Sequence, residues 1–144
     1  VHKVTLPSAG TLQDLTDDSN EAKARYKTFT TPLIYDVLYK VAVGKIVDLR
    51  ARQSDVISRV VSEVNVIRQE NDPKAQTIER WILETQNRFT RSQEKEDTAT
   101  ALKVSANNAN GSYDERQGIL REARQYLKDA NTFLKEIIKE IKTQ

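Results

Sequence analysis

Apolar residues recur between Leu33 and Glu70 at spacings of three and four, which is the period of an amphipathic α-helix. The stretch has one Gly and no Pro, and its apolar positions include Ile34, Val37, Leu38, Val41, Ile57, Val60, Val64 and Ile67. Thr31-Pro32 precedes it, and this pair is typical of a helix start because Pro at the first helical position loses no hydrogen bond. Asn71-Asp72-Pro73 follows it as a stop signal. The pattern predicts one long helix between these two signals.

The same period predicts a second long helix from Pro73 toward Asn108. Its apolar stripe turns polar between Thr90 and Thr98 and resumes at Ala99. The helix therefore either continues through a polar layer or breaks over this segment. We favour continuity because the segment contains no Gly and no Pro.

A third long helix is predicted after the turn Asn107-Asn108-Ala109-Asn110-Gly111, with Ser112 and Glu115 as a capping box. Its apolar residues alternate spacings of three and four over about three heptads, which is the seam of a coiled-coil helix. These residues are Leu120, Ala123, Leu127, Ala130, Leu134, Ile137 and Ile141.

The N-terminal residues predict a shorter element. Val1 to Gly10 have no helical period, so we interpret residues 1–10 as a flexible arm. Residues 11–29 are a candidate short helix, with Asp17, Asp18 and Ser19 as candidate caps. The chain is therefore expected to be all-α. We predict a single domain over residues 11–144, an elongated up-down-up antiparallel bundle of three long helices whose one end is covered by the short N-terminal helix.

The stretch from Leu33 to Val47 is apolar on nearly every face of its predicted helix, so it needs burial nearly all round. Either the short helix covers it or another molecule does. The candidate interface residues are Leu33, Ile34, Tyr35, Val37, Leu38, Tyr39, Val41, Val43 and Val47.

A polar layer is predicted halfway along the bundle, where the hairpin register places polar turns of two helices at one level. Its candidate residues are Asp48, Arg52, Gln53, Ser92 and Glu96. Either Arg50 or Arg52 is expected to meet Glu94 or Glu96 there.

Composition excludes several kinds of site. The chain has no Cys, so disulfides and thiolate chemistry are absent, and its one His, His2, lies in the arm. The carboxylates alternate with Lys and Arg at helical spacing, as on solvated helix faces. There is no Gly-rich phosphate loop, and the net charge of +2 gives no electrostatic case for nucleic acid. We expect no catalytic residues, no metal site and no cofactor.

We therefore expect a non-enzymatic structural or adaptor protein that acts through its helix surfaces. It would be a self-assembling subunit of a filament, appendage or virion, or a secretion or cytoskeletal adaptor, with a protein or a second copy of itself as partner. The alternative is an exported helical effector or toxin that interacts with membranes through residues 33–47, although Asp36, Lys40 and Lys45 interrupt that stretch. The lack of Cys and of an initial Met slightly favours an exported or virion location.

Overall fold

The computed structural model describes residues 11–69 and 73–143, and nearly all of them are helical, with no strand in those ranges. The all-α class is thus confirmed. The elements are α2 (Leu12–Arg25), the π-helix η2 (Tyr26–Thr30), α3 (Thr31–Gln69), α4 (Lys74–Ala101), the short 3₁₀ helix η3 (Ala106–Asn108) and α5 (Ala109–Lys142). The arm predicted over residues 1–10 lies outside the described residues.

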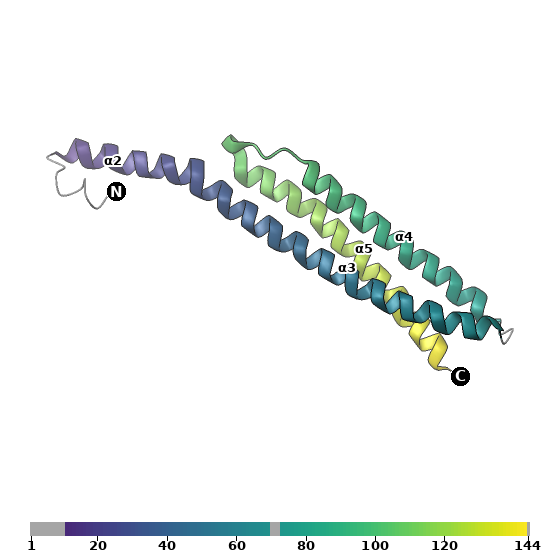
Figure 1. Cartoon of the computed structure of the whole chain (residues 1–144). Helices are drawn as coiled ribbons and strands as arrows, with labels where there is room; N and C mark the ends of the chain where they lie inside the picture. The colour runs from purple at the N-terminus through teal and green to yellow at the C-terminus, as the bar shows by residue number, and fades with distance from the viewer. Residues whose placement is uncertain (1–10, 70–72, 144) are drawn as a thin grey trace.

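Helices α3, α4 and α5 lie side by side and alternate in direction along the chain (Figure 1). α4 and α5 make the most extensive contact, and α3 packs along both of them. The buried face of α5 is the predicted heptad seam, because Leu120, Ala123, Leu127, Ala130, Leu134 and Ile137 are all buried. α4 is continuous through residues 90–98, which confirms the interpretation favoured above.

The core consists of two clusters of buried apolar side chains. One lies toward the α3–α4 connection and includes Ile57, Val60, Val64 and Ile67 of α3, Ile78 and Ile82 of α4, and Leu134 and Ile137 of α5. The other lies toward the α4–α5 connection and includes Tyr39, Ile46, Ala99, Leu120, Ala123 and Leu127. Phe89 packs against both clusters and so joins them into one core.

The N-terminal helix does not cover the end of the bundle, so that prediction is wrong. α2 continues through η2 into α3 and projects past the α4–α5 connection (Figure 1), and neither α2 nor η2 has a buried residue. Thr31-Pro32 does not start a new helix, because the Thr31 N–H donates to Tyr26 O, five residues back. This wider π turn accommodates Pro32, which lacks an N–H and whose ring would crowd an α-helical carbonyl. The cap of α2 is Thr11, which exchanges hydrogen bonds with Asp14.

The connection between α4 and α5 also differs from the prediction. α4 ends at Ala101 rather than near Asn108, because Leu102 has extended backbone and Arg116 Nη2 donates to its carbonyl at 2.5 Å. α5 begins at Ala109, where Asn108 Oδ1 accepts from Gly111 N–H at 3.1 Å. Ser112 does not cap α5, since its Oγ accepts from the Ser105 N–H. Of the predicted turn, Asn107 and Asn108 therefore lie in η3, and Ala109, Asn110 and Gly111 lie in the first turn of α5.

Replacing Gly118 with Ala is expected to raise the free energy of unfolding by about 0.5–1 kcal/mol, because Gly in a helix interior is less favourable than Ala by that amount. A Cβ at this position of α5 would contact nothing within 4 Å. Gly111→Ala is the matched control, since its Cβ would collide with the Asn108 side chain that caps α5. Urea unfolding would measure both, and an equal gain in the two variants would contradict the cap geometry.

Candidate protein-interaction surface

The first half of α3 presents two apolar faces on opposite sides of one helix. The inner face, defined here as Tyr35, Tyr39, Val43 and Ile46, packs toward α4 and α5, with Tyr39 and Ile46 buried. The other side carries Leu33, Ile34, Val37, Leu38 and Val41, and all five are exposed. At about 100° per residue these five fall within an arc of about 140°. The helix is therefore apolar nearly all round but is covered on one side only.

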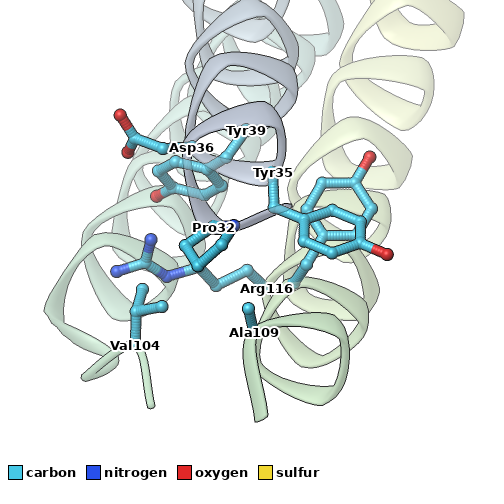
Figure 2. Close-up of a pocket in the computed structure, with 8 residues that line it drawn as sticks. Pro32, Tyr35, Asp36, Tyr39, Val104, Ala109 and Arg116 are labelled. Carbon is cyan, nitrogen blue, oxygen red and sulfur yellow. The ribbon is translucent and has the colours of Figure 1, made fainter. Parts of the chain in front are cut away.

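Aromatic and polar contacts fix the inner face to the end of the bundle (Figure 2). The ring of Tyr35 stacks on that of Tyr113 with centroids 4.8 Å apart, and its hydroxyl donates to Asn110 Oδ1 at 3.0 Å. The Arg116 guanidinium lies over the Tyr39 ring, 4.5 Å from its centroid, and the Tyr39 hydroxyl is 2.8 Å from Thr100 Oγ1. These contacts hold this end of α3 against α4 and α5, so the opposite side of the helix stays outward.

The hollow between these residues is small. It is lined by Pro32, Tyr35, Asp36, Tyr39, Val104, Ala109, Tyr113 and Arg116 (Figure 2). It holds about 250 Å³ with open solvent included.

The exposed apolar face continues beyond α3 into η2 and α2. We define the outer stripe as Leu15, Ala22, Tyr26, Phe29, Leu33, Ile34, Val37, Leu38 and Val41. Its spine from Leu15 to Val41 has spacings of three, four and seven, which keep the residues near one side of the helix. Phe29 is 71% exposed, Leu33 63% and Val37 52%. At about 1.5 Å per residue the outer stripe is about 40 Å long.

The structure separates the predicted interface residues into two groups. Leu33, Ile34, Val37, Leu38 and Val41 lie on the outer stripe, and Val47 is exposed beside it. Tyr35, Tyr39 and Val43 belong to the inner face.

Sequence reasoning missed the upstream part of the outer stripe, Leu15, Tyr26 and Phe29. The signal that could have identified it is the apolar spacing itself, which runs through Thr31-Pro32 without a break.

The residues of the predicted polar layer also fall into two groups, one buried and one exposed. Gln53, Ser92 and Glu96 are buried, and Gln53 Nε2 donates to the Leu127 carbonyl at 3.0 Å. Glu96 pairs with Arg50, one of the two arginines expected to reach it. Asp48 and Arg52 lie outside the layer, where they form an exposed i, i+4 ion pair at 2.9 Å.

The Arg50–Glu96 pair is the charged contact at the centre of the bundle. Arg50 Nη2 lies 2.9 Å from Glu96 Oε2, and the two side chains are only 16% and 11% exposed. The two atoms are within ion-pair distance but lack the alignment of a hydrogen bond. The pair joins the middle of α3 to the end of α4 that packs on it.

The acidic groups that could serve catalysis or metal binding are dispersed over the described residues. In residues 11–69 and 73–143 no group of three His, Asp or Glu side chains is arranged to hold a metal ion. His2 lies outside the described residues.

On the bundle surface Lys95 pairs with Glu122 at 2.5 Å. The hydrogen bond to Glu122, together with the negative charge of that carboxylate, raises the pKa of Lys95.

None of the helices in the described part of the chain has the length and apolar character needed to cross a membrane. Comparison of the sequence with protein-family models and with curated proteins, and of the chain with solved structures, finds no match.

Proposed function

We propose that the chain is a non-enzymatic structural or adaptor protein that acts through its helix surfaces and assembles with itself through the outer stripe. The observation that supports this most strongly is the course of α2, η2 and the start of α3, which leave the bundle as one helix (Figure 1). The apolar residues of this helix have no partner in the described chain on their outer side. Subunits of filaments, appendages and virions, and adaptors of secretion systems or the cytoskeleton, are the classes that such a helix suits.

The energetics favour a partner for this face. Burial of a Val, Leu or Phe side chain contributes roughly 1.5–3 kcal/mol when it is complete. A contiguous apolar face of this length on an isolated helix is typical of a protein–protein interface. The bundle holds the face outward, as the Tyr35–Tyr113 and Tyr39–Arg116 contacts show. Association would therefore require little rearrangement of the subunit.

The triple variant Leu33→Ser/Val37→Ser/Val41→Ser tests the proposal. We expect the unmodified chain to show a molar mass that rises with concentration above 16.4 kDa in light scattering after size exclusion. The variant should associate at least 100-fold more weakly, because it removes about 3 kcal/mol or more of apolar burial.

The matched control is Val66→Ser/Leu83→Ser, which removes apolar residues that are 52% and 66% exposed but lie outside the outer stripe. It should associate like the unmodified chain. Equal loss in both variants would show that the outer stripe is not the interface.

A second candidate function is membrane contact through residues 33–47, as in a helical effector or toxin. Lys45, exposed beside the apolar side chains of α3, favours it because anionic lipid attracts basic residues on such a helix, whereas Lys40 already pairs with Asp36 at 2.7 Å. Flotation with anionic vesicles would detect it. Binding that the triple serine variant loses, from a chain that stays monomeric in solution, would favour this candidate over self-assembly.

A further inference from the structure

Asn110 and Gly111 form the one Asn-Gly pair of the sequence, and the pair lies in the first turn of α5. An Asn is converted to Asp without an enzyme when the peptide nitrogen of the next residue attacks its side-chain amide. A Gly at that next position leaves the nitrogen unhindered because Gly has no Cβ. Asn110 is also exposed, so water reaches its amide. Asn110 is therefore the Asn of this chain with the least steric hindrance to that reaction.

The reaction needs only water as a co-reactant. The Gly111 N–H loses its proton to solvent, and the nitrogen attacks Cγ of Asn110. A bond from the Gly111 nitrogen to Cγ forms, the bond from Cγ to Nδ2 breaks, and Nδ2 leaves as ammonia after taking a proton from solvent. Water then opens the five-membered succinimide ring at either of its carbonyl carbons. Opening at Cγ gives aspartate, whereas opening at the main-chain carbonyl gives isoaspartate, in which the chain continues through Cγ.

Two hydrogen bonds hold the reacting groups in place in the folded chain. The Gly111 N–H donates to Asn108 Oδ1 at 3.1 Å, so the attacking nitrogen is engaged in the cap of α5. Asn110 Oδ1 accepts from the Tyr35 hydroxyl at 3.0 Å, which holds the Asn110 side chain toward α3. Ring closure also requires the main chain at Asn110 to leave the helical ψ of about −42°. The first turn of α5 must therefore open before the nitrogen can attack.

The cap that restrains the reaction also requires the residue that makes the reaction fast. A Cβ at position 111 would collide with the Asn108 side chain, so the cap needs Gly there. Tyr35 is in turn positioned by its stacking on Tyr113, with ring centroids 4.8 Å apart. Reactivity and restraint are thus combined at the corner where α3 is held against α5.

We propose that Asn110 is a deamidation site whose rate is set by the opening of the first turn of α5, and that Asn108 and Tyr35 hold this turn closed. The proposal does not depend on self-assembly. Aspartate at position 110 suits a helix N-terminus, where negative charge is favourable. Isoaspartate adds one carbon to the main chain before Gly111, which disrupts the hydrogen bonding of a helical turn. Its formation would weaken the contact between α5 and Tyr35.

Peptide mapping by mass spectrometry, applied to the full chain aged at mildly alkaline pH, tests the proposal. In concentrated guanidinium chloride, where the turn is open, Asn110 should deamidate faster than the internal control Asn87. In buffer the rate at Asn110 should be at least about 10-fold lower than in guanidinium chloride, because only molecules with the turn open react. Equal rates in the two solvents would overturn the restraint by the fold. A rate at Asn110 in guanidinium chloride no higher than that at Asn87 would overturn the site itself.

Two variants identify the residues that hold the turn closed. Asn108→Ala removes the cap, and Tyr35→Phe removes the hydroxyl but keeps the ring that stacks on Tyr113. Each should deamidate Asn110 about 3-fold faster or more in buffer, and at the unmodified rate in guanidinium chloride. An unchanged or lower rate in buffer would overturn the part assigned to that residue.

Asn108→Asp is the matched control for the cap, because Asp caps a helix about as well as Asn does. It should deamidate Asn110 at the rate of the unmodified chain. A rise equal to that of Asn108→Ala would show that the cap is not what restrains the reaction.

Discussion

An Arg50→Leu variant is expected to lose about 3 kcal/mol of unfolding free energy, because it leaves the Glu96 carboxylate buried without its cation. Arg50 and Glu96 are 2.9 Å apart and their side chains are 16% and 11% exposed, so water cannot replace the lost partner well. The pair also lies near Gln53 and Ser92, which are buried as well. Urea unfolding followed by circular dichroism would measure the loss.

The double variant Arg50→Leu/Glu96→Leu is the control for this loss. Replacing both charges with apolar side chains removes the unpaired carboxylate, so most of the stability should return. Arg52→Leu is a second control, because its ion pair with Asp48 is exposed and contributes about 0–1 kcal/mol. A double variant as unstable as Arg50→Leu would show that the arginine stem, rather than the charge pair, stabilises the bundle.

A Leu127→Ala variant should lose about 3–5 kcal/mol, because it opens a cavity in the centre of the core. Leu127 is fully buried among residues of all three long helices. Its carbonyl accepts the Gln53 hydrogen bond, and that bond is to the main chain, so the substitution leaves it in place. The expected loss therefore reports packing alone. Thermal or urea unfolding would measure it.

Leu83→Ala is the matched control, since Leu83 is of the same type but 66% exposed on α4. It should change the stability by less than about 0.5 kcal/mol. A small effect at both positions would contradict the placement of Leu127 in the core.

The sequence predicts most closely the parts of the fold in which one helical period decides the structure. The α5 seam from Leu120 to Ile137 is buried throughout because apolar residues at alternating spacings of three and four leave a helix one way to pack. The continuity of α4 through residues 90–98 follows from the same reasoning, since no Gly or Pro interrupts it. The polar segment there is compatible with burial because Arg50 meets Glu96.

The sequence-based prediction is wrong where one local signal is compatible with two backbone conformations. Thr31-Pro32 suits a helix start, but the chain instead widens one turn into η2 and continues. No Gly or Asn lies near Thr31-Pro32 to provide the positive φ that a tight reversal needs, so the chain continues as a helix. Asn108 and Ser112 are a similar case, since both are good N-cap residues. In the structure Asn108 caps α5, and the Ser112 hydroxyl accepts from the Ser105 N–H instead.

The sequence predicts the candidate interface only in part. A helix apolar on nearly every face between Leu33 and Val47 indicates two contacts, but periodicity alone does not say which side the bundle covers. The structure assigns Tyr39 to the bundle through Thr100 and Arg116, and this leaves Val37 outward. The extension of the outer stripe to Leu15 depends on α2 continuing into α3, and the helix-start signal at Thr31-Pro32 points against that continuation although the apolar spacing runs through it.

Sedimentation equilibrium of the unmodified chain over a wide concentration range tests self-assembly through the outer stripe most directly. If copies of the chain associate, the weight-average mass rises from about the 16.4 kDa of one chain to at least twice that value. A single species of 16.4 kDa at the highest concentration reached would contradict self-assembly.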